Sequence, residues 1–252
     1  MKTTIKSPKV IGIILTYKHA SFLEDLYHSL PEGVFDSIIV SNDESGDNIG
    51  VIAEKLGIPY FSHPRLGYGG NIKYGLQKAL EMGGEYMVEI HGDGQYGTLG
   101  IIPGIQKMKK GYDFILGSRF TDLNLPLKDK MPFLKYLANI GLSFLDRLIL
   151  RLPLSEFHTG FRIYSRRLLT KADLKHTSND HLFSFQIIAL AAYHNLKVGE
   201  IPVRGDYAHE HSSISIRESV KYTFQTFDVL AQYLWTRLGF ETKLFKRSKH
   251  SI

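Results

Sequence analysis

Three side chains that could bind a hard cation stand at alternate positions directly after an apolar run at residues 86–90. They are His91, Asp93 and Gln95, and a glycine occupies each intervening position. Open α/β sheets bind their ligands at the carboxyl ends of parallel strands. A cation held there by carboxylate and amide oxygens can in turn hold a diphosphate. The spacing therefore indicates a metal site at a strand end, and a polar turn without a ligand is the simpler alternative.

The composition excludes several kinds of chemistry. The chain has 252 residues, 43% of them hydrophobic, enough for one α/β domain with a substantial core. It contains no cysteine, so no disulfide, thiolate nucleophile or cysteine–zinc site can form. The N-terminus lacks a signal-peptide pattern, and the longest uncharged apolar stretch, residues 136–145, is too short to cross a bilayer. We expect a cytoplasmic protein, either soluble or peripheral at the inner face of the membrane.

The net charge of +6 suits anionic partners such as nucleotides and lipid phosphates. The C-terminus is locally basic and interleaves apolar residues with the charges. The segment contains Trp235, Leu238, Phe240, Leu244 and Phe245 beside Lys243, Lys246, Arg247 and Lys249. This mixture fits a membrane-surface segment, and equally a solvated tail after a core helix. The other basic residues are dispersed and no nucleic-acid-binding module is present, so we expect no nucleic-acid partner.

The elements that must position the strand-end residues can be read from apolar runs and helix-end signals. Strands are expected at 10–15, 37–40, 58–62, 86–90 and 113–116. Ser21 and Glu24 have the spacing of a capping box for the first helix. Gly57 follows a helix that ends at Leu56, and a glycine-rich loop precedes a third helix. Four strand–helix units in the first ~115 residues predict an α/β fold with a mostly parallel sheet.

The second half has longer helical patterns and fewer strands. We expect a polar loop at 121–130, a helix at 131–150, strands at 160–164 and 198–203, and a long amphipathic helix at 216–238. No linker demands a separate domain. We therefore predict one domain over 1–252, with a nucleotide-sugar-binding half at about 9–120, an acceptor-side half at about 121–215, and a helix with a basic tail at 216–252.

Six short motifs occur in an order that resembles the inverting family 2 glycosyltransferases. They are Thr16-Tyr17, Asn42-Asp43-Glu44-Ser45-x-Asp47, Leu66-Gly-Tyr-Gly-Gly-Asn71, Gly117-Ser-Arg-Phe120, Glu156-Phe-His-Thr-Gly-Phe-Arg162 and Gly199-Glu-Ile-Pro-Val203. The run from His91 to Gln95 is similar to the Asp-Ala-Asp-Gly-Gln form of dolichyl-phosphate mannosyltransferases and bacterial polyprenyl-phosphate glycosyltransferases. The chain departs from the family pattern at Lys18, His19, Asn42, His91 and Glu156. The resemblance spans most of the chain and implies a Rossmann-like, GT-A-type fold.

The resemblance also implies a set of site residues and a divalent cation, Mn²⁺ or Mg²⁺. The implied metal ligands are Asp93, His91 and Gln95, and the implied catalytic residues are Asp93, Glu156, Arg119 and Arg162. The implied donor-binding residues are Thr16, Tyr17, Asp43, Gly69, Gly70, Asn71 and Gly92. Mg²⁺ prefers oxygen ligands whereas Mn²⁺ tolerates imidazole, so a histidine in this place hints at Mn²⁺.

Several of these residues have a stated chemical role and a structural alternative. Asp43 could accept hydrogen bonds from a nucleoside, although aspartate is also common in turns. Arg119 could pair with a phosphate through its planar fork, and Arg162 and Lys135 are candidates on the acceptor side. Glu156 could be a general base for a hydroxyl acceptor or could only orient other groups. His158, His209 and His211 could be polar loop residues without a site.

The function implied is metal-dependent transfer of a sugar from a UDP- or GDP-sugar to a polyprenyl phosphate, with inversion at the anomeric carbon. One alternative is transfer to a hydroxyl of a saccharide or lipid-linked glycan. Another is a degenerate family member that acts as a scaffold without catalysis. A sugar nucleotidyltransferase would share the sheet and the metal but would normally carry a Gly-rich, basic first loop. The sequence leaves the base, the sugar and the oligomeric state open.

Overall fold

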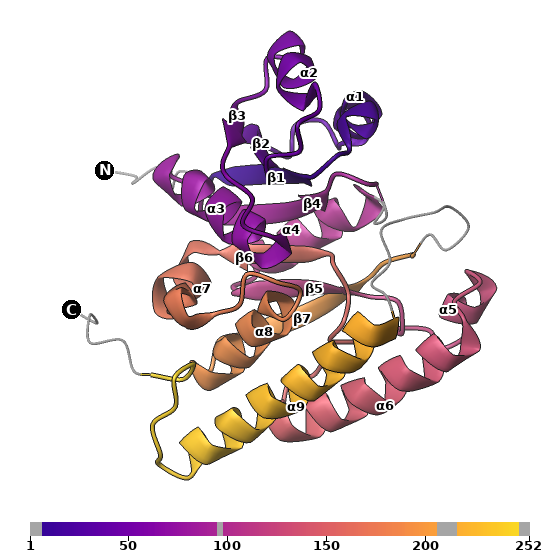
Figure 1. Ribbon diagram of the computed structural model, residues 1–252, viewed down its shortest axis with the longest axis vertical. Helices are drawn as coiled ribbons and strands as arrows, with labels where there is room; N and C mark the ends of the chain where they lie inside the picture. The colour runs from indigo at the N-terminus through magenta and orange to yellow at the C-terminus, as the bar shows by residue number, and fades with distance from the viewer. Residues whose placement is uncertain (1–6, 95–97, 206–215, 247–252) are drawn as a thin grey trace.

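The computed structural model describes residues 7–94, 98–205 and 216–246. These residues form one seven-stranded sheet with helices packed around it (Figure 1). The strand order is β3-β2-β1-β4-β6-β5-β7. Every pairing is parallel except those that β6 makes with β4 and β5. The strands are β1 (Val10–Thr16), β2 (Ser37–Asn42), β3 (Tyr60–Ser62), β4 (Tyr86–His91), β5 (Phe114–Ser118), β6 (Arg162–Ser165) and β7 (Val198–Pro202). The prediction of a mostly parallel sheet is confirmed.

Helices cover both faces of this sheet. Short helices α1 (Leu23–Ser29) and α2 (Ile49–Lys55) and the longer α4 (Ile101–Lys109) lie on one face. The other helices are α3 (Tyr68–Glu81), α5 (Leu125–Lys128), α6 (Phe133–Leu150), α7 (Arg166–Lys171), α8 (Phe183–Tyr193) and α9 (Ile216–Arg237). Three 3-10 turns, η1 (Ala20–Phe22), η2 (Thr98–Gly100) and η3 (Leu174–His176), complete the described elements.

The alternation of side chains along β1 explains why the protein has two cores. Ile11 and Ile13 belong to the cluster that also contains residues of α3, α8 and α9, whereas Val10 and Ile14 belong to the cluster with α1, α2 and α4. Successive side chains of a strand point to opposite faces of the sheet. The uniformly apolar sequence of β1 is therefore the pattern of a central strand that is buried on both faces.

The structure corrects several expected helix boundaries. The predicted capping box is wrong, because η1 leads directly into α1 and neither start has a side-chain cap. The expected loop at 121–130 contains α5. Gly69 and Gly70 lie in the first turn of α3 rather than in a loop before it. Helix α8 was not foreseen, because it is apolar on every side and buried from Phe183 to Ala192, and so has little periodicity.

The C-terminal segment also differs from the expected membrane-surface tail. Leu244 and Phe245 are buried in the core, where the Phe245 ring packs against Tyr193 and Tyr233. Trp235 and Phe240 are exposed and stack on each other with ring centroids 4.4 Å apart. Of the helices in the described ranges, none is long and apolar enough to span a bilayer. The interleaved apolar residues at the C-terminus therefore divide into two that are buried in the core, Leu244 and Phe245, and three that are exposed, Trp235, Leu238 and Phe240.

Candidate active site

The ends of five strands bring the predicted residues to one edge of the sheet. Thr16 pairs with Asn42 across β1 and β2, and Leu15 pairs with His91 across β1 and β4. Because these strands are parallel, their carboxyl ends lie together. Strand β6 runs antiparallel, so that its first residue, Arg162, lies beside Glu89 at the same edge. β5 and β7 end there too, and Arg119 follows β5 directly.

Asp93 stands in a tight turn that is pressed against the end of β1. The Gly94 amide donates to the His91 carbonyl over 3.1 Å, and the Gly92 amide donates to the Leu15 carbonyl over 2.9 Å. A Cβ on Gly92 would lie only 2.6 Å from that Leu15 oxygen, so glycine is required for this close approach. Gly92 thus packs against the end of β1 at Leu15 and Thr16, and Asp93 follows it in the turn. Gln95, the third predicted metal ligand, lies outside the described residues.

His91 is directed toward the interior through its Nε2 atom. This nitrogen lies 3.1 Å from Glu89 Oε1 and 3.0 Å from the Gly160 carbonyl oxygen. Both partners are acceptors, so Nε2 carries a proton and is not free to coordinate a metal. Burial lowers the pKa of His91, but the hydrogen bond and charge of Glu89, together with Asp93, outweigh it and raise the pKa overall. Direct metal binding by His91 stays a prediction.

Glu89 is the centre of a buried charge cluster that sequence reasoning missed. Its Oε1 accepts from Tyr68 Oη over 3.2 Å, and its Oε2 accepts from Tyr164 Oη. Burial raises the pKa of Glu89, but the hydrogen bond from His91 and the nearby charge of Arg162 lower it overall. The signal that could have found it is a carboxylate inside an apolar strand, two residues before His91 and on the same strand face.

Arg162, on the neighbouring strand β6, also belongs to this cluster and is 1% exposed. Its Nη1 donates to Ser184 Oγ over 2.8 Å and lies 3.9 Å from Glu89 Oε1. Among the groups that the structure describes, its Nε has no hydrogen-bond partner. The arginine therefore balances the charge of Glu89 below the sheet edge. Its predicted contact with a phosphate stays a prediction.

Arg119 and Glu156 form a buried ion pair that the family motifs did not reveal. The Arg119 backbone amide donates to Glu156 Oε2 over 2.7 Å, and its Nε donates to Oε1 over 2.9 Å. Arg119 Nη2 also donates to Glu156 Oε1. The Glu156 side chain is 0% exposed. Such a carboxylate is badly placed to take a proton from a substrate, which favours the orienting role over the general-base role.

Lys135, from α6, lies close to this pair. Burial lowers the pKa of Lys135, and the positive charge of Arg119 lowers it further, whereas Glu156 acts in the opposite direction. The residue as a whole is nevertheless solvent-exposed. Lys135 thus adds positive charge beside the Arg119–Glu156 pair.

Asp43 fixes the loop before α3 by accepting hydrogen bonds from two of its backbone amides. Its Oδ1 accepts from the Leu66 amide over 2.6 Å and its Oδ2 accepts from the Gly67 amide over 3.0 Å. Gly67, the residue directly before α3, has a φ of +83°, a conformation that favours glycine. The carboxylate is buried and holds the loop, while its predicted contact with a nucleoside stays a prediction. Each carboxylate oxygen has a second lone pair that such a contact could use.

Asn71 and the two helical glycines make contacts within the protein. Asn71 Oδ1 accepts from Ser41 Oγ over 2.6 Å and lies 3.0 Å from His63 Nε2. A Cβ on Gly69 would lie 2.6 Å from the Asp180 carbonyl, and one on Gly70 would lie 2.5 Å from Leu66 Cβ. The close approach that these glycines allow is thus to residues 178–183 and to the preceding loop. Their contact with the donor is untested.

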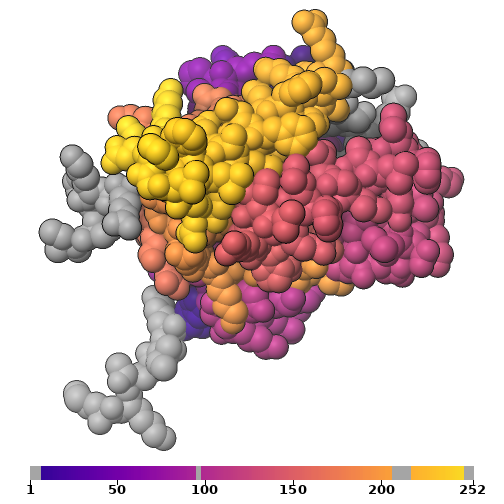
Figure 2. Space-filling view, turned by 90° about the horizontal axis from the view of Figure 1, so that it is seen from below, coloured from indigo at the N-terminus to yellow at the C-terminus, as the bar shows by residue number. Residues whose placement is uncertain are grey.

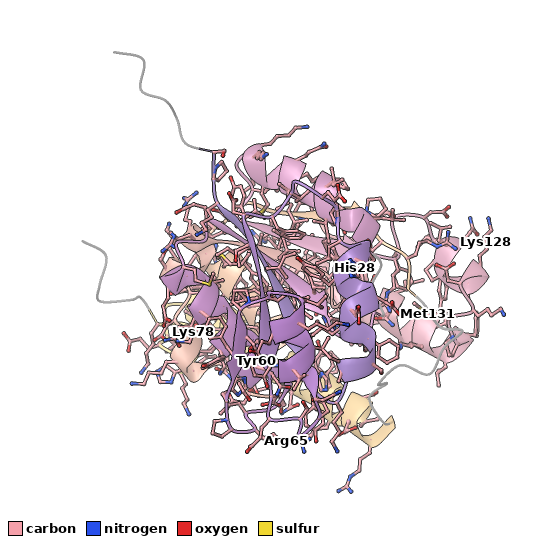
Figure 3. All side chains as sticks on the ribbon, turned by 90° about the horizontal axis from the view of Figure 1, so that it is seen from above. His28, Tyr60, Arg65, Lys78, Lys128 and Met131 are labelled. Atoms are coloured by element: carbon pink, nitrogen blue, oxygen red, sulfur yellow. The ribbon has the colours of Figure 1, made fainter. Side chains whose placement is uncertain are left out.

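Tyr17, a predicted donor-binding residue, is half-buried and has a cation beside its ring. The Arg65 guanidinium lies 4.3 Å from the centroid of the Tyr17 ring. Arg65 is exposed and lies at the periphery of the view from above (Figure 3). Sequence reasoning did not identify Arg65, and a basic residue before a glycine-rich helix start is too common to be a signal. The pair places a ring and a cation near the ends of β1 and β2.

A second buried polar group joins α6, α9 and the loop before β6. His158 Nε2 lies 3.0 Å from Asp146 Oδ2, and His158 Nδ1 lies 3.1 Å from Tyr222 Oη. The Asp146–His158 contact has ion-pair distance without hydrogen-bond alignment. Burial raises the pKa of Asp146 although His158 acts to lower it. His158 lies in a loop, as expected, but its side chain is 8% exposed and contacts Asp146 and Tyr222. His209 and His211 lie outside the described residues.

The described residues fit a divalent cation through one carboxylate. Within 7–94, 98–205 and 216–246, no three His, Asp or Glu side chains converge as a complete protein site. Mg²⁺ in phosphate chemistry is commonly held by one or two carboxylates with water and substrate oxygens as the other ligands. Asp93 is 9% exposed at the strand-end edge and could supply that carboxylate. The donor diphosphate would have to supply further oxygens.

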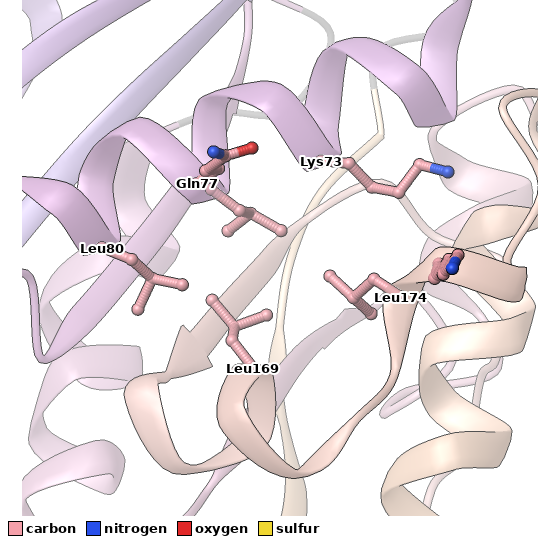
Figure 4. Close-up of a pocket in the computed structure, with 7 residues that line it drawn as sticks. Lys73, Gln77, Leu80, Leu169 and Leu174 are labelled. Carbon is pink, nitrogen blue, oxygen red and sulfur yellow. The ribbon is translucent and has the colours of Figure 1, made fainter. Parts of the chain in front are cut away.

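A shallow cavity lies away from the strand-end edge. A hollow of about 300 Å³ lies between α3, α7 and η3, as Figure 4 shows. Leucines at 76, 80, 169 and 174 line it together with Lys73, Gln77 and Lys175. None of the strand-end residues borders it. The cavity therefore has no part in the chemistry that Asp93 and Arg119 could perform.

Comparisons with known proteins add to this geometry. The model of a family described as glycosyl transferase family 2 matches residues 13–172. UDP-N-acetylglucosamine–dolichyl-phosphate N-acetylglucosaminyltransferase of Methanococcus voltae is 25% identical over 215 residues, 77% of this chain and 84% of that enzyme. Polyprenol monophosphomannose synthase of Mycolicibacterium smegmatis is 22% identical over 213 residues, 80% of this chain and 78% of that enzyme.

A solved structure has the same arrangement of elements. Glucosyl-3-phosphoglycerate synthase from Mycobacterium tuberculosis, in complex with Mn²⁺, UDP-glucose and phosphoglyceric acid, is similar with a TM-score of 0.67. The likeness covers 94% of this chain and 81% of that one at 15% sequence identity. At this identity the comparison shows a shared fold, and the identity of the ligands remains a property of that enzyme.

Proposed function

Because the chain belongs to glycosyl transferase family 2 and is a glycosyltransferase of GT-A fold, we propose that it transfers a sugar from a nucleoside-diphosphate sugar to a polyprenyl phosphate. The donor is a UDP- or GDP-sugar, and transfer inverts the anomeric carbon. The two relatives named for dolichyl-phosphate and polyprenol-phosphate chemistry support the acceptor class. Their different sugars, N-acetylglucosamine and mannose, leave the sugar open.

The observation that supports a phosphate acceptor is the burial of the Glu156 carboxylate and its pairing with Arg119. A hydroxyl acceptor needs a base to remove its proton, and Glu156 stands in the motif that could supply one. Both of its oxygens accept hydrogen bonds from Arg119, and its side chain is fully buried. A phosphate acceptor is already anionic and attacks without losing a proton. The buried ion pair is therefore compatible with a phosphate acceptor and unfavourable for a hydroxyl.

The bond changes of this reaction balance without an added reagent. An oxygen of the acceptor phosphate forms a bond to the anomeric carbon from one face. The bond from that carbon to the donor diphosphate breaks on the opposite face, and its electron pair leaves with the diphosphate. When bound at Asp93, Mn²⁺ or Mg²⁺ would offset the negative charge of that leaving group.

The residues of the chain have distinct parts in this scheme. Asp93 carries the charge that attracts the cation, and the Glu89–His91 contact supports the turn from below. Arg119, oriented by Glu156, and Lys135, whose pKa is lowered by burial and by Arg119, provide positive charge on the acceptor side. Fixed cations aimed at phosphate oxygens cost no reorganisation during the reaction, which is how such groups lower a barrier.

The proposal can be tested with purified protein and defined acceptors. UDP and GDP, each with and without Mn²⁺ or Mg²⁺, should be compared for thermal stabilisation. A ligand at about 100 times its dissociation constant adds roughly 2.7 kcal/mol. The stabilising nucleotide then defines the donor set for transfer to undecaprenyl or dolichyl phosphate and to a free saccharide. Product on the saccharide alone would contradict the phosphate acceptor, and no nucleotide binding would favour a scaffold.

A further inference from the structure

Helix α6 has its polar residues inside and its apolar residues outside. Its buried positions are Asn139, Ser143, Asp146 and Leu150, so three of the four are polar. A helix on the surface of a globular protein normally buries its apolar stripe. The reversed orientation means that burial within the chain does not explain the apolar residues of α6.

The outward residues of α6 form a regular stripe. Large apolar side chains at 134, 137, 144 and 148, with Gly141 between them, follow the spacing of one helix face. Leu134 is 80% exposed, Phe144 is 66% exposed and Leu148 is 65% exposed. Single exposed apolar residues are ordinary, whereas a continuous stripe marks an interaction surface.

Helix α9 carries a second stripe beside the first. Val220, Phe224, Phe227 and Leu234 recur at the same helical spacing, and Leu238 continues it directly after the helix ends at Arg237. All five are exposed. The inner face of α9 is conventional, since Val229, Leu230 and Tyr233 are buried in the core. The two helices are in contact and lie side by side on one face of the molecule, α6 in pink and α9 in yellow (Figures 1 and 2). Their stripes make one surface, called here the α6–α9 face.

The charges around the α6–α9 face identify its partner. Basic residues outnumber acidic ones in 121–151 and in 216–246. Lys128 projects outward from α5, as Figure 3 shows, and Arg147 and Arg151 are exposed at the end of α6. Lys243 and Lys246 lie beyond α9 and are also exposed. An apolar helix face bordered by lysine and arginine matches the interface of an anionic lipid bilayer.

Two further observations favour lipid over a second copy of the chain. The exposed Trp235 and Phe240 rings stack at one end of the α6–α9 face, and aromatic side chains are enriched where a bilayer meets water. A symmetric pair of chains would bring the basic borders of both copies together, and like charges across an interface oppose association.

We infer that the α6–α9 face docks on an anionic membrane surface, with both apolar stripes at the boundary between headgroups and acyl chains. The helices lie on the bilayer and do not cross it. This inference goes beyond the proposed reaction and does not require the acceptor to be a lipid. The membrane would lie against the outer side of α6, whose inner side carries Asp146. Asp146 contacts His158, which follows Glu156 by two residues in the sequence.

The test is partition of the full chain onto vesicles in the absence of donor and acceptor. Phosphatidylcholine vesicles are compared with phosphatidylcholine–phosphatidylglycerol vesicles by co-sedimentation. One variant carries Phe144→Ser and Leu148→Ser on α6, and another carries Phe224→Ser and Leu238→Ser on α9. The matched control carries Leu99→Ser and Ile102→Ser, two exposed apolar residues at η2 and α4 on the opposite side of the sheet.

Wild type and the control should bind anionic vesicles, and binding should weaken with added salt. Each α6 or α9 variant should partition at least about tenfold less, because two large apolar groups are lost from the boundary. Equal partition of all four proteins would overturn the inference. So would a self-association, measured by ultracentrifugation without lipid, that the α6 and α9 variants abolish. Thermal stabilisation by nucleotide is measured in parallel, so that failure of the proposed function is seen separately.

Discussion

The strand-end edge and the outer layer formed by helices α6 and α9 differ in how their buried polar groups are paired. At the edge, charged side chains are buried and closely paired, as in Arg119 with Glu156 and in Glu89 with His91. In the outer layer, α6 turns Asp146 inward, and both of its oxygens lack a hydrogen-bond partner within the described part of the chain. The outward side of that layer is apolar. The edge pairs its charged groups inside the protein, whereas the layer places its apolar side chains outside.

Helices α3 and α6 differ in which of their two sides is buried. Both helices have an apolar and a polar side in sequence, and α3 buries its apolar side through Ile72, Leu76 and Ala79. Helix α6 buries its polar side. Amphipathic spacing therefore determines that a helix has two faces, but not which of them the protein covers.

The largest expected effect is loss of the buried ion pair at the edge. Glu156→Gln keeps the shape of the side chain and leaves Arg119 buried without a counter-charge. Breaking such a pair lowers the free energy of unfolding by about 3–5 kcal/mol. Chemical denaturation measures this. The control is Arg204→Gln, since Arg204 pairs with Asp129 but is exposed, and it should change stability far less. Equal effects of the two substitutions would show that burial does not distinguish the pairs.

A second pair of variants compares the helices directly. Leu76→Ala in α3 removes a side chain that is 1% exposed, and should lower the free energy of unfolding by about 2–5 kcal/mol. Leu148→Ala in α6 removes an exposed side chain and should change it by less than about 0.5 kcal/mol. Both values come from denaturant titration without lipid. A large loss from Leu148→Ala would mean that the α6 stripe contributes to the fold after all.

Asp93→Asn separates activity from stability at the edge. It preserves the side-chain shape but removes the negative charge that would attract the cation. We expect transfer to fall by about 100-fold or more, the scale seen when one electrostatic contact to a developing charge is lost. Initial rates against Mn²⁺ and Mg²⁺ concentration measure this, with thermal melting as the control for folding. Wild-type rates in Asp93→Asn, or wild-type transfer that EDTA leaves unchanged, would exclude the metal from this mechanism.

The smallest expected effect concerns the Glu89–His91 contact and depends on pH. The pKa of Glu89 is lowered from its ordinary 4.5, so its contribution is present above that pH and is lost as pH falls. The pKa of His91 is raised from its ordinary 6.5, so its contribution is complete below that pH and is lost as pH rises. The contact should therefore stabilise the protein most between pH 4.5 and 6.5.

His91→Gln tests this window. Hydrogen bonds to charged groups contribute about 1.5–3 kcal/mol, and the difference in unfolding free energy from wild type should approach that range between the two values. It should shrink in more acidic and in more alkaline solution. Denaturation at a series of pH values gives the measurement. A difference that does not vary with pH would indicate that His91 is not charged in the folded protein.

Much of the first half of the chain could be predicted from the sequence, because its signals are local. The apolar run 10–15 and the glycine after Leu56 are set by burial and by backbone conformation within a few residues. The strand-end motifs followed from their positions after such runs. The pairing of Arg119 with Glu156 could not be predicted, because the two lie 37 positions apart and meet only when β5 and β6 are adjacent.

The sequence alone determined the alternation of strands and helices, the membership of family 2, and the presence of Asp93 at a strand end. The tertiary structure decided which residues are free to act and which are occupied. It paired the Glu156 carboxylate with Arg119, directed His91 toward Glu89, and turned the apolar side of α6 outward. The physical reason is that periodicity reports only the solvent preference of a side chain, whereas a partner and a facing surface depend on which distant elements pack together.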